Sequence, residues 1–145
     1  MIRKITVAEF LDGSTELLRQ HWLETEADLA PNGPNPSVGM YTLLQEQNSL
    51  ILFGAFNGDE MVGYVAVFVY PHPHYGIVFA QHDVLFVRKD KRLGSIAGRL
   101  KCLADAEARR RGAKFICWHA KPGSQMEKML SSRYPLEDLI FRQEL

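Results

Sequence analysis

The chain has 145 residues, 46% of them apolar and 23% charged, and its 17 basic residues balance its 17 acidic ones. This length supports one hydrophobic core, so we expect a single domain over residues 1–145. No apolar run approaches the roughly 18–20 residues that cross a bilayer, which argues against a membrane-spanning protein. The first residues lack the apolar region of a secretory signal, and 2 cysteines are too few for a disulfide framework, so we expect a cytoplasmic protein.

The charges are separated along the chain. Residues 1–60 are mainly acidic, whereas residues 88–114 are mainly basic. We therefore expect one end of the molecule to attract an anion and the other to accept a cation, although two solvated helix faces of opposite sign explain the pattern equally well. The bases are not interleaved with aromatic residues, so a nucleic acid is the least favoured partner.

The first third of the chain is expected to be mainly helical. Thr6 and Glu9 have capping-box spacing, which predicts the start of a helical turn. Ser14 is expected to cap a longer helix, and Ser37 should cap another one after the irregular, proline-rich residues 30–36. The apolar faces expected for these two helices comprise Leu17, Leu18, His21 and Trp22, and Val38, Tyr41 and Leu44.

Six segments have the composition and alternation of strands. They are residues 2–6, 50–56, 61–70, 77–87, 114–119 and 139–145. Asn57-Gly58 predicts a tight turn between the second and third of them, and the apolar run 77–87 is expected to be a central strand buried on both faces.

A long amphipathic helix is expected after the fourth strand. It should begin near Ile96 and end at Gly112, which acts as a left-handed cap, and a shorter helix is expected over residues 124–133. The long helix should carry Ile96, Leu100, Leu103, Ala104 and Ala108 on its apolar side and the ion pairs Asp105–Arg109 and Glu107–Arg111 on its solvent-exposed side. The whole order predicts a mixed α/β sheet with helices on both faces.

Residues 84–98 form the most informative segment, because a strand runs through a basic, glycine-containing turn into a helix. Such a junction leaves backbone N–H groups free at the helix N-terminus, where the helix dipole also favours an anion. Small side chains at Gly94, Ser95 and Ala97 allow a ligand to approach the backbone. Four bases, Arg88, Lys89, Lys91 and Arg92, add positive charge. The segment favours a pyrophosphate site; the alternative is an ordinary turn with solvated bases.

The element order and this turn resemble the GNAT superfamily of acyl-coenzyme A-dependent N-acyltransferases. In that family the turn follows Arg/Gln-x-x-Gly-x-Gly/Ala, and here Arg92-Leu-Gly-Ser-Ile-Ala97 occupies it. Gly94 comes one place early, and Ser95 stands where glycine is usual. The resemblance implies a mostly antiparallel mixed sheet of six to seven strands, in which the fourth and fifth strands splay apart, and it points to a small bacterial or phage-type member.

The resemblance also implies acetyl-coenzyme A as the acyl donor. Its pyrophosphate would lie on the turn, and its pantetheine arm would pair with the fourth strand. A backbone N–H near Leu85 would then stabilise the oxyanion. The cofactor-binding residues expected on this basis are Leu85, Phe86, Val87, Arg92, Leu93, Gly94, Ser95, Ile96 and Ala97.

Three residues are candidates for the chemistry. Relatives often carry a carboxylate at the position of Gln81, which is no useful base. Its neighbours His82 and Asp83 should point to opposite faces, and Asp83 is favoured because it shares the side of Gln81, with His82 second. His119, on the far lip of the opening, is the third candidate. Asp83 could equally be a partner for a nearby base, and His119 an ordinary strand-end residue.

The general acid is unassigned. The family usually places a tyrosine near the position of Met129, and Tyr134, the available substitute, is more often a packing residue. His72 and His74 lack a third ligand, so no metal site is expected. Cys117 lies in an apolar strand and is expected to be part of the core.

The favoured function is transfer of an acetyl group from acetyl-coenzyme A to a primary amine of a small molecule or protein. An acidic rim would favour a cationic acceptor; it comprises Glu24, Glu26, Asp28 and Glu46. The alternative is a GNAT-fold binding protein with weak or no catalysis that acts through a macromolecular partner, which the displaced glycine, Gln81 and the missing tyrosine favour. The last strand leaves an edge open for a homodimer.

Overall fold

The computed structural model describes residues 1–143. Its centre is one mixed sheet with the order β1-β2-β3-β4-β5, in which β5 runs parallel to β4 and the other neighbours are antiparallel. The strands are β1 (Ile2–Lys4), β2 (Leu50–Asn57), β3 (Glu60–Pro71), β4 (Val78–Val87) and β5 (Ile116–Cys117). None of the helices within residues 1–143 combines the length and apolarity that crossing a bilayer demands.

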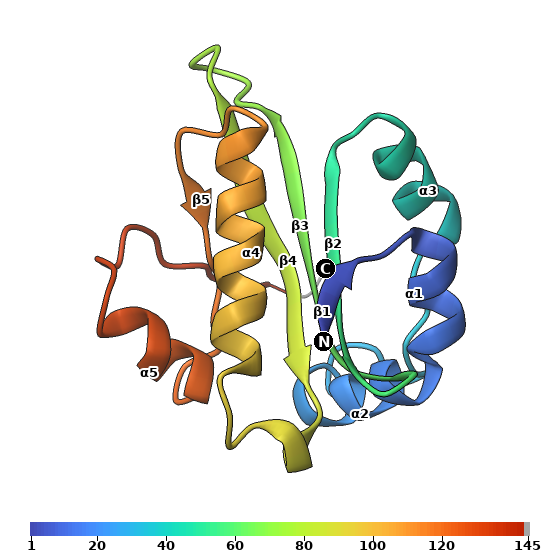
Figure 1. Ribbon diagram of the computed structural model, residues 1–145. Helices are drawn as coiled ribbons and strands as arrows, with labels where there is room; N and C mark the ends of the chain where they lie inside the picture. Colours follow the sequence, from blue (N-terminus) through green and yellow to red (C-terminus); the bar gives the residue numbers. More distant parts are fainter. Residues whose placement is uncertain (144–145) are drawn as a thin grey trace.

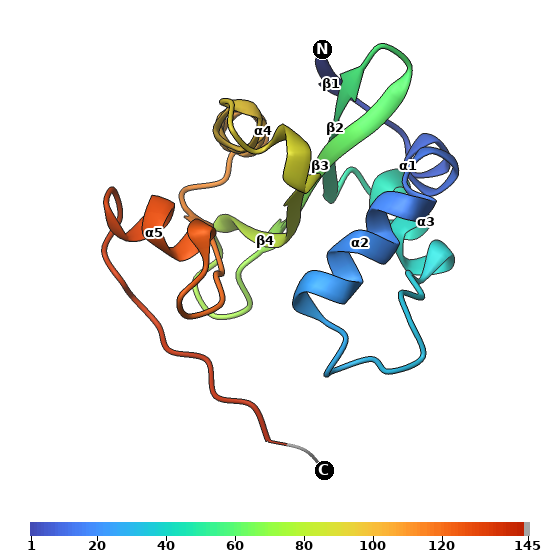
Figure 2. The same cartoon turned by 90° about the horizontal axis from the view of Figure 1, so that it is seen from below.

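Helices cover both faces of this sheet, as the sequence predicted (Figures 1 and 2). On one face lie α1 (Val7–Gly13), α2 (Thr15–Thr25) and α3 (Val38–Glu46). On the other lies α4 (Ile96–Arg110), which follows the short 3-10 helix η1 (Lys89–Lys91), and α5 (Gln125–Ser131) follows β5 beside α4.

Each face of the sheet has its own core. Leu100, Ala104 and Ala108 of α4 are buried against strand residues on one face, and the half-buried Ile96 packs with them, which confirms four of the five residues predicted for that helix side. Leu103 is the exception, with 38% exposure. On the other face, Phe10, Leu17 and Tyr41 pack with Tyr64 and Phe86. The periodic spacing of large apolar residues therefore produces two cores separated by the sheet.

The predicted turns and caps are mostly confirmed. Thr6 Oγ1 accepts from the Glu9 N–H at 3.2 Å, and Glu9 Oε2 accepts from the Thr6 N–H at 2.8 Å, which completes the capping box. Gly58 and Gly112 have φ of +61° and +88°, a conformation that suits glycine at a tight turn and a helix end. The Ser14 cap was wrong: α2 begins after it, but its side chain is fully buried and makes no capping bond.

The charge pattern of α4 differs from the prediction. Glu107 and Arg111 pair at 2.9 Å as expected, but their side chains are only 6% and 12% exposed, and Lys4 of β1 also reaches Glu107 at 2.9 Å. Asp105 pairs with Lys101 at 2.7 Å rather than with Arg109. A helix face that spacing alone marks as wet is therefore partly an internal ion-pair network.

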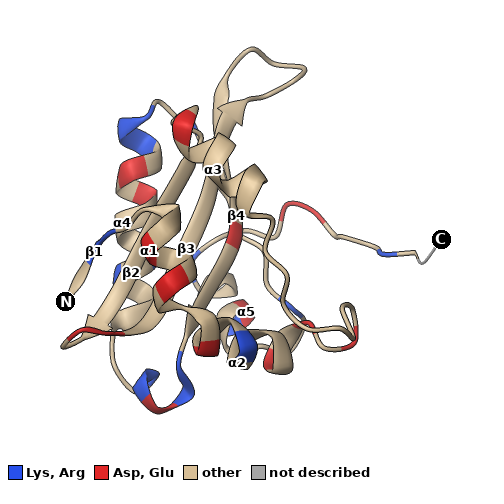
Figure 3. Cartoon of the chain, turned by 90° about the vertical axis from the view of Figure 1, so that its right-hand side faces the viewer, with Lys and Arg blue, Asp and Glu red and all other residues tan. Residues whose placement is uncertain are grey.

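The sheet has five strands, so the expectation of six to seven was wrong. Residues 139–143 form no strand, and residues 144–145 lie outside the described part. Leu139, Ile140 and Phe141 are 68%, 74% and 88% exposed, and this segment extends away from the helices and the sheet (Figures 2 and 3). Strand propensity depends on a neighbouring strand and a face to bury, and this segment has neither.

Candidate active site

β4 and β5 run side by side only briefly and then diverge, and we call the space along the unpaired edge of β4 the opening. The two strands pair only at Ala80 with Ile116 and at Gln81 with Cys117. The expected strand over residues 114–119 is thus cut to Ile116–Cys117, because the two strands diverge beyond this point. Residues 82–87 of β4 have no partner in β5, so the predicted splaying of the fourth and fifth strands is confirmed. A ligand entering here meets an unpaired strand edge that offers backbone N–H and C=O groups.

A β-bulge interrupts β4 beside this opening. Val84 pairs with Ala66 of β3 and His82 pairs with Val67, so Asp83 is an extra residue without a partner in β3. A bulge bends its strand and redirects side chains. It leaves Asp83 facing α1–α3, on the same side as Val84, whereas His82 faces the α4 side, next to Trp118.

The turn that follows β4 presents free backbone amides. The Arg99 N–H makes the first intrahelical bond of α4, to Ser95 O at 2.9 Å, so the N–H groups of Ile96, Ala97 and Gly98 have no backbone partner in the described structure. Gly94 has open space where a side chain would point, since an added Cβ would meet nothing within 4 Å. The Leu93 side chain is fully exposed and does not fill the turn. The turn can therefore bring at least three N–H groups to one anion.

The bases of this turn are less available than their number implies. Arg92 donates to both carboxylate oxygens of Glu24 at 2.6 and 2.7 Å, and its Nε donates to Val87 O at 2.7 Å. Arg88 pairs with Glu60 and, at 2.7 Å, with Asp90. Figure 3 shows basic and acidic residues next to one another at the turn below β4. The predicted excess of positive charge is thus largely compensated, and the backbone amides become the main anion-binding feature.

Asp83 is a half-buried carboxylate with one hydrogen-bond donor. The Tyr41 hydroxyl of α3 donates to Asp83 Oδ2, and the Tyr41 side chain is itself buried. Burial raises the pKa of Asp83 above its ordinary value, and the Tyr41 bond opposes that rise. Burial, and then the charge of Asp83, raise the pKa of Tyr41, so its hydroxyl keeps its proton. The pair holds a carboxylate ready to accept a proton on the α1–α3 side of β4.

Tyr64 lies near this carboxylate and His21 contacts Tyr64, and sequence reasoning missed both as site residues. His21 Nδ1 and the Tyr64 hydroxyl are 2.8 Å apart, and the His21 ring stacks on Phe86 with centroids 4.7 Å apart. Burial lowers the pKa of His21 and raises that of Tyr64, where the Asp83 charge adds to the effect. The sequence feature that could have identified His21 as a site residue is its place among apolar residues on the predicted inner face of its helix.

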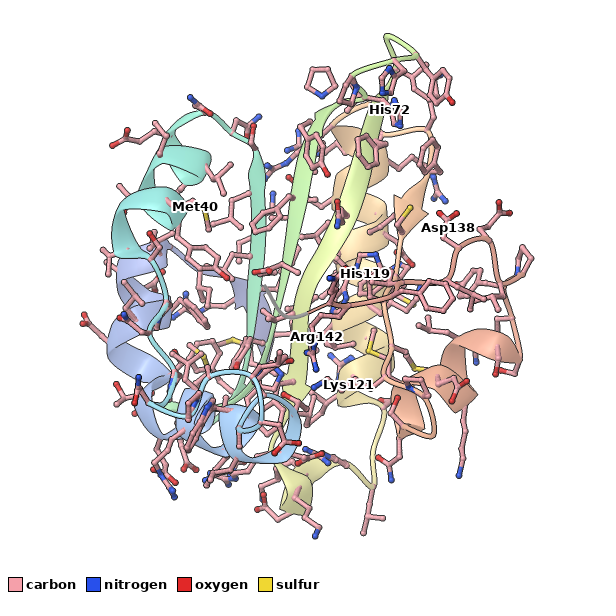
Figure 4. The ribbon with its side chains drawn as sticks, turned by 180° about the vertical axis from the view of Figure 1, so that it is seen from behind. Met40, His72, His119, Lys121, Asp138 and Arg142 are labelled. Carbon is pink, nitrogen blue, oxygen red and sulfur yellow. The ribbon has the colours of Figure 1, made fainter. Side chains whose placement is uncertain are left out.

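The two candidate histidines lie together across the opening. The His82 ring is 5.0 Å from the Trp118 ring and 6.3 Å from the His119 ring, measured between centroids. Figure 4 shows His119 beside β4, on the segment that follows β5. Burial lowers the pKa of His82 to about 3, and the charges of His119 and His21 act in the same direction. His82 therefore stays neutral at physiological pH and is a poor base.

Other residues considered from the sequence have structural contacts. The Tyr70 hydroxyl donates to Gln81 Oε1, and the Tyr134 hydroxyl accepts from Lys101 Nζ at 3.1 Å. Tyr134 is thus held against α4 and away from the Asp83 face. Burial raises the pKa of the Cys117 thiol, which lowers its reactivity.

The acidic rim is partly neutralised. Glu24 pairs with Arg92, and Glu26 lies 3.5 Å from Lys121, whereas Asp28 and Glu46 form no ion pair within residues 1–143. Both pairs connect the end of α2 to segments that flank the opening. Two surface hollows of ≈ 140 and ≈ 400 Å³ lie over β1 and β2, and none of the candidate catalytic residues lines them.

His72 and His74 lie at the far end of the β3–β4 hairpin, away from His119 (Figure 4). The His72 ring stacks on Tyr75 with centroids 4.4 Å apart. In the described part of the chain, no three His, Cys, Asp or Glu side chains converge as a metal site would require.

No protein-family model matches this chain, and no curated protein matches it significantly. Solved structures do match over its whole length. An aminoglycoside acetyltransferase from an uncultured soil metagenomic sample superposes with a TM-score of 0.77 at 19% identity, covering 100% of this chain and 97% of that one. A ribosomal-protein-alanine N-acetyltransferase from Brucella melitensis biovar Abortus 2308 superposes with a TM-score of 0.78 at 18% identity, covering 100% of this chain and 96% of that one. A transcriptional regulator from Bacillus halodurans C-125 superposes with a TM-score of 0.69 at 19% identity, covering 100% of this chain and 99% of that one. The chain thus has the fold of the GNAT acetyltransferases, as its sequence predicted.

Proposed function

We propose that this chain is an N-acetyltransferase that moves an acetyl group from acetyl-coenzyme A to a primary amine. The observation that carries the proposal is the combination of an open β4 edge and an amide-lined turn with a half-buried carboxylate, Asp83, on the α1–α3 side of β4. The fold alone does not establish the activity, since unrelated functions share folds. The arrangement of these groups supports it, because each matches one requirement of acyl transfer.

The residues present fit an acyl-coenzyme A donor. The free N–H groups of Ile96, Ala97 and Gly98 would hold the pyrophosphate, next to the space around Gly94. The unpaired edge of residues 85–87 would hold the amide-containing arm, in the way that one strand pairs with another. The donor supplies a thioester, whose carbon–sulfur bond breaks as the acceptor nitrogen bonds to the acyl carbon.

Asp83 is the residue that we assign to proton transfer. An amine acceptor arrives as an ammonium ion and must lose a proton before it can attack. The raised pKa of the Asp83 carboxyl makes it a better base than an exposed aspartate, while the Tyr41 hydroxyl keeps it ionised. Tyr64, whose hydroxyl contacts His21, lies on the same side of β4 as Asp83. His119 lies on the opposite side of β4, so we give it no proton-accepting role.

The acceptor that suits this site is a primary amine on a cationic molecule or a protein N-terminus. A half-buried carboxylate with Tyr41 and Tyr64 beside it favours an ammonium group. Two of the structural neighbours act on such amines, one on aminoglycosides and one on a ribosomal protein's alanine. We extend this acceptor class to the present chain.

The test is amine-dependent release of thiol from acetyl-coenzyme A by the purified full chain. The amine panel should include a polyamine, an aminoglycoside and a peptide with an N-terminal alanine. We expect turnover with at least one of them and a loss of about 100-fold or more in kcat/KM for Asp83→Asn, which keeps the shape and the Tyr41 bond but removes the base. Equal activity of this variant would exclude Asp83 as the base.

The second candidate function is a binding protein without catalysis. Two observations favour it: Gln81 replaces a carboxylate, and Tyr134 is engaged by Lys101 rather than placed in the opening. A structural neighbour described as a transcriptional regulator shows that this fold also occurs in proteins with other roles. This candidate predicts saturable binding of acetyl-coenzyme A with no thiol release for any amine in the panel.

A further inference from the structure

His82 is buried without a hydrogen-bond partner. Its side chain is 8% exposed, and neither Nδ1 nor Nε2 contacts a donor or an acceptor within residues 1–143. A neutral imidazole has one N–H group and one lone pair, so leaving both unpaired lowers the stability of the folded chain. Native proteins retain few such groups, and each one calls for an explanation, of which a catalytic role is one.

The position of His82 indicates which part of a bound ligand its side chain would contact. Gln81 and Cys117 form the last pair between β4 and β5, so His82 and Trp118 are the next residues of each segment. Their rings lie 5.0 Å apart at the closed end of the opening. A ligand that runs along the free β4 edge therefore ends at His82.

The neighbours of His82 differ in how firmly they are held. Trp118 Nε1 donates to Asp105 Oδ1 at 3.1 Å, and Lys101 Nζ lies 4.7 Å from the Trp118 ring. The His119 side chain makes no hydrogen bond in the described part of the chain, and the residue lies outside the helices and strands. His119 is thus the side chain that can turn aside and expose His82 to a ligand.

We propose that His82 donates a hydrogen bond from its neutral ring to the carbonyl oxygen of the donor's thioester, an inference that rests on the proposed function. The carbonyl oxygen is an acceptor of the kind that the ring N–H lacks. The low pKa of His82, caused by burial, keeps the ring neutral, so it neither takes the ammonium proton nor gives up its own. A fixed N–H donor stabilises the negative charge that develops on the oxygen, and a neutral imidazole can polarise a carbonyl in this way.

The bulge in β4 assigns two neighbouring residues to opposite sides of the reaction. Asp83 faces the acceptor side with Tyr41, and His82 faces the donor side with Trp118. During transfer the carbon–nitrogen bond forms and the carbon–sulfur bond breaks. Asp83 receives the first proton of the ammonium group. The coenzyme A sulfur leaves with the electron pair of the broken bond and takes up the second proton that the nitrogen loses, while His82 keeps its own proton.

The test compares two ligands that differ only in the acyl group, acetyl-coenzyme A and free coenzyme A. His82→Phe keeps a ring against Trp118 and removes both nitrogens. We expect the ligand-free variant to melt about 2–4 °C higher, because two unsatisfied groups are gone. Its Kd for acetyl-coenzyme A should weaken about three- to tenfold, while its Kd for coenzyme A stays within about twofold. Where amine-dependent turnover is measurable, kcat should fall by about 100-fold.

Two further variants make the comparison decisive. His74→Phe is the matched control, because His74 is exposed and its ring nitrogens make no hydrogen bond in residues 1–143; it should change neither the melting temperature nor either Kd. His82→Gln retains an N–H donor and should keep part of the preference for acetyl-coenzyme A, and it gives the same comparison should His82→Phe not fold.

Two outcomes would overturn the proposal. A lower melting temperature for His82→Phe would identify an ordinary structural histidine. An equal loss of affinity for both ligands would show that His82 does not contact the acyl carbonyl. Failure of the wild-type chain to bind either ligand is a different result, which contradicts the proposed function itself.

Discussion

Ser95 is the position at which the amide-lined turn can be tested most directly. Its side chain is exposed and makes no capping bond, so its replacement removes no contact from the folded chain. Ser95→Glu places a carboxylate at the N-terminus of α4, whose first turn contains no acidic residue. The added carboxylate will interact with the free N–H groups of Ile96, Ala97 and Gly98 and will occupy the space proposed for the pyrophosphate.

Ser95→Glu should raise the stability of the ligand-free chain and lower its affinity for acetyl-coenzyme A. A carboxylate at a helix N-terminus stabilises a protein by about 0.3–1 kcal/mol. For 145 residues at about 2.1 cal/mol/K of unfolding entropy per residue, this free energy raises Tm by about 1–3 °C. Two unit charges about 5 Å apart at an effective dielectric constant of about 40 repel by roughly 1.7 kcal/mol. Each phosphate charge near the new carboxylate therefore weakens donor affinity roughly tenfold or more.

The assay is a thermal melt without ligand, followed by a calorimetric titration with acetyl-coenzyme A. Ser95→Lys is the opposite change: it should lower the ligand-free Tm slightly and leave binding intact or stronger. Gly39→Glu is the control for the helix effect, because it adds a carboxylate to the first turn of α3, where an added Cβ meets nothing within 4 Å. It should raise Tm without changing affinity. If Ser95→Glu and the wild type bind the donor equally well, the phosphates do not lie on this turn.

Three further substitutions test the groups around β4 and α4. Tyr41→Phe removes the hydroxyl that donates to Asp83, so the Asp83 pKa should rise further and the acidic limb of the kcat/KM profile should move to higher pH; an unmoved limb would contradict the assignment of Asp83. Asp83→Asn should be more stable than the wild type at neutral pH. The folded-state pKa of Asp83 is raised, so wild-type stability falls as pH rises through the window above the unfolded value, and urea unfolding from pH 4 to 7 should show the difference growing with pH. Glu107→Gln should lower the free energy of unfolding by about 2 kcal/mol at pH 7, since its bond to Arg110 holds the Glu107 pKa below its ordinary value and Lys4 and Arg111 also pair with it. That stability is present above the unfolded pKa of about 4.5 and is lost as pH falls, so a constant deficit down to pH 3 would refute the reasoning.

Features with local causes were predictable from the sequence. The apolar run that forms β4, the small residues of the turn and the start of α4 near Ile96 each depend on neighbours in the chain. The opposite orientation of His82 and Asp83 follows from strand alternation, and the structure places them so. Residues close together in the sequence were also sufficient to predict the Thr6 capping box and the helix end at Gly112.

Features that depend on packing were not predictable. Tyr41 reaches Asp83 across 42 positions, and Arg92 reaches Glu24 across 68, so no local pattern marks either contact. Counting charges treats every base as free, which is why the turn was expected to be more positive than it is. The absence of a strand over residues 139–143 has a similar cause, because strand formation requires a partner that propensity does not supply.

The extra residue in β4 also shifts the parity of the strand. Before it, even-numbered residues such as Ala80 face α4, and after it odd-numbered residues such as Leu85 and Val87 do. Deleting Asp83 would therefore restore regular alternation and leave every other side chain of the strand on its present side. The carboxylate is an insertion that the fold can gain or lose in a single step, independently of both cores.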